Sequence, residues 1–425
     1  MEMGLSMAAR AEITAKYARE YKRASKKDRG RLLDEVVSVT GWSRDNARRR
    51  LSQAAAPKPK IRGGPSRARK PRPFKYSYDA RKVLQRVWAM SMGQCGKYLV
   101  VSLPDLLEAL EAHGELVPGV DRYSSEVKEE LLSMSAATID RYLKPLKDGT
   151  NLKGAGATKP SPLLRSSIKI RKAGDEMENR PGFFEGDTVA HCGPTLVGEF
   201  ARTLNLTDIF TGWTTTTSIR NNSSRHIIAG LNRIIDRCPI PLEGVDFDNG
   251  SEFINYDVVA WAQDLELYFT RSRPYKKNDQ ASIESKNNHV VRKYAFYWRY
   301  DTAAQLSLLE RLWVNVNDYM NYYTPTTKPV RWDTDAKGRR KRLYDTPKTP
   351  FDRLKDAGAL TKAQTLEMEA YKASLNPAAL ARNITRIQSE LTALAKRGTV
   401  KLIAQTEARN KLPNTAKGIK LPQAS

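Results

Sequence analysis

The region from Gly182 to about residue 290 alternates between strand-like and helix-like patterns, and their order restricts the fold more than any other feature. Three runs rich in threonine, aromatic and aliphatic residues come first and predict consecutive strands. Helical and strand-like segments then alternate. The expected elements are strands at 183–189, 200–208 and 213–219, a helix at 227–235, a strand at 242–247, a helix at 256–265, a strand at 267–270 and a helix from 281. This order predicts an α/β domain.

Three acidic residues occupy distinctive places in these elements. Asp187 lies inside the first strand, Asp248 ends the fourth, and Glu284 lies in the last helix. Their carboxylates meet if the first and fourth strands are neighbours. Oxygen ligands suit Mg²⁺ or Mn²⁺, and paired ions of this kind promote in-line attack on phosphodiesters. We therefore expect all three to be catalytic and to bind two Mg²⁺ (or Mn²⁺) ions per active site. Glu185 and Asp246 share the same strand faces and stay as alternatives.

The residues around two of these acids closely resemble the retroviral-integrase superfamily, in particular bacterial insertion-sequence transposases with an integrase-type (DDE) catalytic core. The resemblance extends over about residues 180–300 and rests on Asp248-Asn249-Gly250-Ser251-Glu252-Phe253 and Ser282-Ile283-Glu284-Ser285-Lys286-Asn287. It implies a ribonuclease-H-like fold and favours Asp248 over Asp246. The family's amino-terminal zinc module is not expected, because the four histidines and three cysteines cannot form it at matching positions.

The activity implied by this resemblance is that of a transposase, which binds transposon ends, cleaves their 3′ ends and transfers them into target DNA. Water and then a DNA 3′-hydroxyl are the nucleophiles, so no ATP is required. Two other functions stay open: a non-catalytic, domesticated DNA-binding regulator, and a ribonuclease-H-like nuclease.

The composition points independently to a polyanionic partner. Lys and Arg number 72 against 47 Asp and Glu, for a formal net charge of +25. We expect double-stranded DNA as the partner, both terminal inverted repeats and target DNA. No apolar run approaches about 18 residues and no signal-peptide layout is visible, so a cytoplasmic, nucleoid-associated bacterial protein without membrane contact is expected.

Two segments before the core have the pattern of helix-turn-helix modules. Residues 25–52 combine a capping box at Ser25 with a break at Gly41. The basic residues of its second helix that are expected to contact DNA are Arg44, Arg48 and Arg49. An ordinary helical hairpin with a solvated basic face is the alternative. In the second module, a helix at 125–132 is followed by one that carries Arg141, which is also expected to contact DNA.

Basic residues near the expected active site are candidates for binding DNA phosphates: Arg271, Arg273, Lys276, Lys277 and Lys286. After residue 323 the chain becomes basic and proline-rich, which suggests a small β-rich or extended segment in contact with DNA. A helix is expected from Pro377 to a stop at Gly398. Its short heptad seam from Leu380 to Leu394 packs on its own domain or mediates self-association. A homo-oligomer on DNA is expected, because two transposon ends must be held together.

The expected domain organisation follows from these patterns. It comprises a helix-turn-helix module at 1–56, a basic proline-rich linker at 57–75, a second helical module at 76–148, a linker at 149–180, the catalytic core at 181–323, and a basic, mostly helical region at 324–425 with a helix at 377–397 and a disordered tail.

Overall fold

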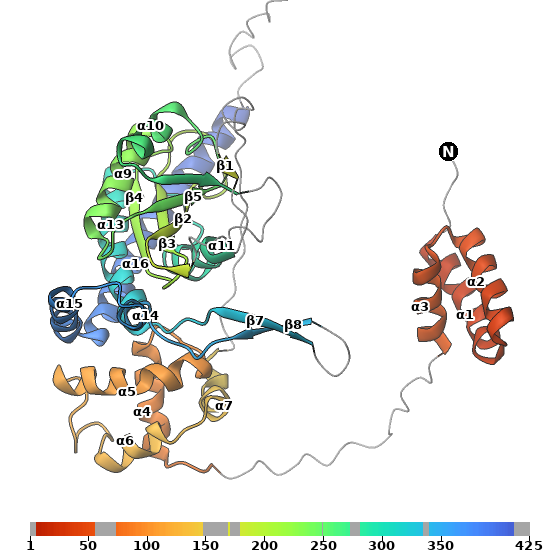
Figure 1. Ribbon diagram of the computed structural model, residues 1–425, viewed down its shortest axis with the longest axis horizontal. Helices are drawn as coiled ribbons and strands as arrows, with labels where there is room; N and C mark the ends of the chain where they lie inside the picture. Colours follow the sequence, from red (N-terminus) through yellow and green to blue (C-terminus); the bar gives the residue numbers. More distant parts are fainter. Residues whose placement is uncertain are drawn as a thin grey trace, which may run out of the picture. The chain divides into compact units, whose positions relative to one another are not determined.

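The computed structural model describes residues 6–55, 74–147, 169–170, 179–248, 250–272, 281–334 and 340–411. They fall in two compact units, Met1–Pro73 and Phe74–Ser425, and each is described by itself (Figure 1). Most of both expected linkers and the expected disordered tail lie outside the described residues, as do Asn249, Arg273, Lys276 and Lys277.

The first unit is a bundle of α1 (Met7–Arg23), α2 (Lys26–Thr40) and α3 (Arg44–Ala55). Its small core consists of Ala18, Leu33, Val36, Ala47 and Leu51. Ser25 caps α2 as expected, since the Asp28 backbone N–H donates to Ser25 Oγ at 3.3 Å, and Ser25 Oγ lies 2.6 Å from Asp28 Oδ2, to which it donates. Gly41 ends α2 in the left-handed conformation, with φ of 66°. The two helices at 25–52 are therefore present, whereas α1 was not predicted.

A six-stranded sheet forms the centre of the second unit. Its order is β1-β6-β5-β2-β3-β4, and the strands are β1 (Lys169–Ile170), β2 (Phe183–Ala190), β3 (Arg202–Asp208), β4 (Thr214–Ile219), β5 (Gly244–Phe247) and β6 (Tyr268–Arg271). β2 pairs antiparallel with β3 and parallel with β5. The five strands predicted between 183 and 270 are confirmed, with β2 and β5 adjacent in the sheet.

Helices cover this sheet in the predicted order. They are α9 (Ser224–Arg237), α10 (Tyr256–Asp264) and α11 (Ala281–Lys286), followed by a π-helical turn, η3 (Asn287–Arg292), and by α12 (Lys293–Ala295). α11 packs against β2 and β3. Between β2 and β5 the packing is so close that a Cβ on Gly186 would lie 2.3 Å from Phe247 Cε1. Glycine at this position therefore lets the aromatic ring pack directly over the centre of the sheet.

Helix α13 (Ala303–Tyr323) packs along the edge strand β4. Its asparagine side chains form hydrogen bonds with the backbone of β4, as a neighbouring strand would. Asn321 accepts from the Thr214 N–H at 3.0 Å and donates to the Thr214 carbonyl at 2.8 Å. One turn earlier, Asn317 makes the same pair of bonds with Thr216, both at 3.1 Å. These amides satisfy the backbone groups that an edge strand leaves open.

The helices before the sheet belong to the same compact unit. They are α4 (Tyr78–Met90), α5 (Gly96–Ala112), α6 (Ser125–Leu132) and α7 (Ala136–Lys147). Gln94 Nε2 donates to the Tyr323 carbonyl at 2.9 Å, and the Tyr319 hydroxyl donates to the Met90 carbonyl at 2.8 Å. These bonds join the α4–α5 connection to α13.

The C-terminal part contains the hairpin β7 (Pro329–Thr334) and β8 (Arg340–Tyr344), then α14 (Pro350–Asp356), α15 (Lys362–Ser374) and α16 (Pro377–Lys411). The predicted start at Pro377 is confirmed, but the predicted stop at Gly398 is wrong, since α16 continues to Lys411. Gly398 does not adopt a positive φ. A glycine in a helix costs only about 1 kcal/mol relative to alanine, which is too little to end a long helix by itself.

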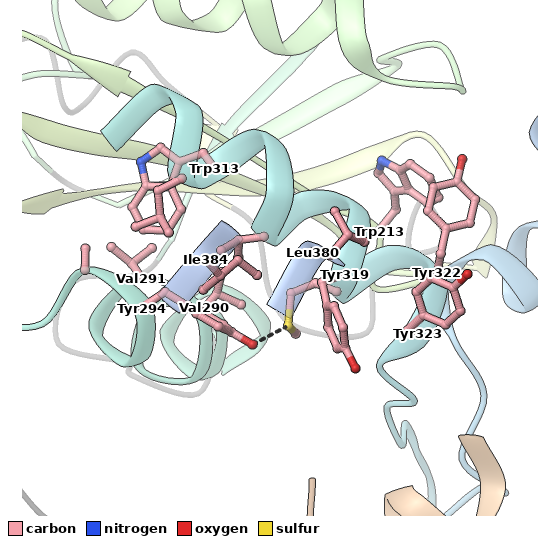
Figure 2. Packing of buried hydrophobic residues seen from close by; sticks show 14 of the residues in the cluster. Trp213, Val290, Val291, Tyr294, Trp313, Tyr319, Tyr322, Tyr323, Leu380 and Ile384 are labelled. Atoms are coloured by element: carbon pink, nitrogen blue, oxygen red, sulfur yellow. Dashed lines mark hydrogen bonds between the residues drawn. The ribbon is translucent and has the colours of Figure 1, made fainter. Parts of the chain in front are cut away.

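The heptad seam of α16 packs inside its own unit, which was one of the two expected possibilities; the other was self-association. Leu380, Ile384, Ile387 and Leu391 are buried. Figure 2 shows Leu380 and Ile384 beside Trp313 and Tyr319 of α13. This part of α16 is therefore not free for self-association. Within the described ranges, no helix combines the length and apolar character needed to cross a membrane.

Candidate active site

The register of the two central strands brings Asp187 and Asp248 side by side. Gly186 of β2 is the partner of Phe247, the last residue of β5. Asp187 follows Gly186 within β2, and Asp248 follows Phe247 directly after β5. Neighbouring strands lie about 4.8 Å apart. The turn after β5 fixes the second carboxylate, because the Gly250 N–H donates to Asp248 Oδ1 at 2.7 Å. Two residues 61 positions apart in the sequence thus share one point at the centre of the sheet.

Two acids lie close together at this point, and the pKa of one of them is raised. Burial, and next the negative charge of Asp248, raises the pKa of Asp187 to about 8. The Thr188 N–H donates to Asp187 Oδ1 at 2.6 Å and opposes this shift. Oxygen donors in such an arrangement suit a hard divalent cation.

The helix that carries Glu284 is fastened to β2 on both sides of that residue. Before it, the Ile283 N–H donates to Glu185 Oε2 at 2.8 Å. After it, Asn287 Nδ2 donates to Asp187 Oδ2 at 2.5 Å. Asn287 is the first residue of η3, and π-helical turns are frequent at functional sites. The backbone of Glu284 is therefore held beside Asp187, while its side chain lies outside the described part.

A second layer of polar contacts supports the Asn287 amide. Asn205, the partner of Asp187 in β3, donates through Nδ2 to Asn287 Oδ1 at 3.1 Å. The Asn287 amide thus has both its donor and its acceptor engaged, which fixes its orientation. Among the side chains that the structure describes, no three of the types His, Cys, Asp and Glu are arranged to hold a metal ion.

The two alternative acids bind protein groups nearby. Glu185 is buried and accepts from the backbone of α11. Asp246 is buried and accepts from the Thr270 hydroxyl at 2.7 Å. The first contact fastens α11 to the sheet, and the second links strands β5 and β6 within it.

A buried ion pair beside these acids was not foreseen from the sequence. Arg202 Nη1 donates to Glu252 Oε1 at 3.2 Å and to Thr188 Oγ1 at 3.1 Å, and Thr188 Oγ1 donates to the same carboxylate oxygen. The other oxygen, Glu252 Oε2, is buried with no hydrogen-bond partner among the described residues. A Cβ on Gly250 would meet both this oxygen and Asp248 Oδ1. Glu252 thus faces the same point, and its place in the Asp248 motif was the only signal for it.

The predicted DNA-binding residues lie in several environments. Lys286 donates to the Gly212 carbonyl at 3.2 Å, and burial lowers its pKa to about 8. Arg271 is buried at the end of β6. Exposed positions are occupied by Arg48, Arg49 and Arg141. Arg44 forms an ion pair with Asp34.

A family model and one relative match this chain over the region just described. The integrase core domain family matches residues 178–277. An uncharacterized protein of Sinorhizobium fredii, y4rM, is 38% identical over 356 residues, which cover 83% of this chain and 97% of that protein.

Two solved structures of the HTLV-2 integrase catalytic core domain in complex with magnesium are also similar. The dimeric form is 14% identical, covers 35% of this chain and 91% of that chain, and has a TM-score of 0.26. The trimeric form is 14% identical, covers 28% and 69%, and has a TM-score of 0.22. Scores this low add no weight to the assignment.

Proposed function

We propose that this chain, which belongs to the integrase and transposase type of proteins with an integrase core domain, is a transposase that cleaves the 3′ ends of its element and joins them to target DNA. The observation that carries the proposal is the proximity of Asp187 in β2 and Asp248 directly after the neighbouring strand β5, with the Glu284 helix fastened to Asp187 through Asn287. The proposal adds the carboxylate of Glu284 to these two acids as the third member of the site.

The donor set fits divalent cations. Asp187, Asp248 and Glu284 would hold them. The pKa of Asp187 is raised by its burial and next by the negative charge of Asp248, and a bound cation would offset both effects. Bound Mg²⁺ or Mn²⁺ supplies polarisation of the phosphodiester and activation of the attacking hydroxyl. We propose two ions per site, as the three carboxylates would allow.

The remaining groups at the site position the acids. Asn287 and the Thr188 N–H orient the two oxygens of Asp187. Glu252, which lies close to Asp187 and Asp248, forms an ion pair with Arg202 that balances its negative charge. These contacts leave Asp187 in one fixed orientation, which is what positioning of a reacting group requires.

Recognition of the transposon ends falls to the helical regions. The short connection between α2 and α3 and the exposed Arg48 and Arg49 support a helix-turn-helix reader in the first unit. Arg141 on α7 is a further candidate. Two ends must be brought together, so we propose a homo-oligomer on DNA. The element would be a bacterial insertion sequence.

The test uses the inverted repeats that flank the gene as labelled duplexes. Full-length protein should nick their 3′ ends with Mg²⁺, and Asp248→Asn should abolish nicking while end binding stays within about twofold. The amide keeps the size of the carboxylate but cannot serve as a charged ligand. Retained nicking by Asp248→Asn would refute the assignment. A wild-type protein that binds the ends without cutting them would instead favour the DNA-binding regulator.

A further inference from the structure

The hairpin of β7 and β8 is highly exposed on its first strand. All six residues of β7 are exposed. Trp332 pairs with Arg342 across the two strands, and Arg331 pairs with Leu343. Figure 1 shows the hairpin extending away from the six-stranded sheet and from the helices around it. Both faces of this two-stranded ribbon are therefore open to a partner.

The described side chains of this ribbon include basic and aromatic groups at exposed positions. Arg331, Trp332 and Arg342 are exposed, and Asp333 is the one acid among the described residues of the two strands. The Arg342 guanidinium lies 4.9 Å from the centre of the Trp332 ring, yet 53% of Trp332 is exposed. Charged side chains on an exposed hairpin can serve simply to prevent its strands from pairing with another protein chain. Such protection requires neither an excess of positive over negative charge nor an exposed tryptophan. The composition of this hairpin therefore indicates a polyanionic partner.

The base of the ribbon is firmly held. Lys328 Nζ donates to the Phe210 carbonyl in the β3–β4 turn. On another side, the hydroxyls of Tyr98 in α5 and Thr327 share a hydrogen bond of 3.3 Å. After β8, Arg353 binds Asp345 at 2.6 Å. A ribbon held in this way keeps a fixed direction relative to the sheet.

The β3–β4 turn also holds the helix of the candidate active site. Lys286, two residues after Glu284, donates to the Gly212 carbonyl of that turn, and Lys328 at the base of the hairpin binds the Phe210 carbonyl of the same turn. One short turn therefore fastens both the hairpin and the Glu284 helix, and a partner bound along the ribbon has a defined position with respect to the candidate site.

We propose that the β7–β8 hairpin is an arm that binds duplex DNA and holds it in register with the active site. A two-stranded ribbon fits the width of the major groove of B-DNA, and its arginines can reach the phosphates on either side. Trp332, stiffened by Arg342, supplies an apolar contact to the groove wall or the sugars. The inference rests on the proposed function only in taking DNA as the partner.

The test compares two double charge reversals in the full chain. Arg331→Glu/Arg342→Glu alters the hairpin, and Lys362→Glu/Lys396→Glu makes the same change at exposed positions of α15 and α16. Binding to a fluorescent duplex of mixed sequence is measured by anisotropy across a series of salt concentrations. We expect the hairpin variant to bind roughly 10- to 100-fold more weakly, with a salt slope smaller by about two, since each phosphate contact contributes about 0.9.

The matched variant should keep the wild-type slope, and Arg331→Lys/Arg342→Lys should retain most of the affinity. Equal effects of the two reversals, or none from the hairpin reversal, would overturn the arm, as would tighter binding to duplex RNA than to DNA. All measurements are repeated in the Asp248→Asn background, so that cleavage of the duplex cannot alter the measured binding. If wild-type protein nicks the ends while the hairpin variant binds the duplex as tightly as wild type, the DNA-binding arm is refuted and the proposed transposase function is not.

Discussion

Asn287 Nδ2 lies 2.5 Å from Asp187 Oδ2 and donates a hydrogen bond to it across 100 residues of sequence. Since Asn287 directly follows α11, this bond fixes the end of the Glu284 helix against β2, as the Ile283 N–H bond to Glu185 fixes its other side. A second bond, from Asn205 to Asn287 Oδ1, prevents the amide from turning over. Of these contacts, only the Asn287 amide binds Asp187 itself.

Replacing Asn287 with alanine should therefore slow 3′-end cleavage by about 10- to 100-fold, because a small displacement of a catalytic group is costly. Single-turnover kinetics with Mg²⁺ measure this effect. Ser285→Ala, an exposed change in the same helix, is the control and should stay near wild type. Full activity in Asn287→Ala would show that the helix is positioned by other contacts.

The raised pKa of Asp187 makes metal binding depend on pH. Between the ordinary value of 3.8 and about 8, the folded metal-free protein keeps a proton that the unfolded chain releases. Its free energy of unfolding therefore falls as the pH rises through this window. A cation must displace the same proton, so the affinity for Mn²⁺ should rise by up to about tenfold per unit between pH 6 and 8. Calorimetric titration would detect the released proton, and a pH-independent affinity would contradict the pKa.

The buried ion pair of Arg202 and Glu252 should be sensitive to the loss of one partner. Arg202→Leu leaves Glu252 uncompensated beside two other acids and should cost about 3–5 kcal/mol of unfolding free energy. The double change Arg202→Leu/Glu252→Leu should cost clearly less. Because the excess charge faces the site, saturating Mn²⁺ should restore part of the stability of the single variant. Urea unfolding with and without Mn²⁺ measures both effects, and equal losses in the single and double variants would speak against a charge effect.

The edge of the sheet provides a test of the fold itself. Asn321→Ala leaves the buried N–H and carbonyl of Thr214 without their partner and should destabilise the second unit by about 2–4 kcal/mol. Asn315 lies on the same helix, and its amide contacts only the Arg311 carbonyl among the bonds identified for it. Asn315→Ala should therefore cost less than about 1 kcal/mol. If Asn321→Ala and Asn315→Ala lower the free energy of unfolding by equal amounts, the loss comes from helix packing and not from the contact with β4.

The strands and helices of the core could be predicted because each has its own local pattern of apolar residues. The meeting of Asp187 and Asp248 was conditional on the adjacency of β2 and β5, which local patterns do not carry and which the order of the sheet shows. Local patterns do not carry the bond between Asn287 and Asp187, or the pair of Arg202 and Glu252, whose partners lie far apart in the sequence. The stop expected at Gly398 failed for the opposite reason, since a single weak local signal was outweighed by a long run of helix-forming neighbours.

If Asp187 and Asp248 together serve one DNA-joining site, both acids are required in a joining assay. A labelled duplex with a recessed 3′ end of the element is incubated with supercoiled plasmid, full-length protein and Mg²⁺. We expect joining by the wild-type protein, none with a 3′-deoxy end, and none with Asp187→Asn, although that variant still binds the duplex. Joining that persists in Asp187→Asn would contradict a catalytic role of Asp187 in this site.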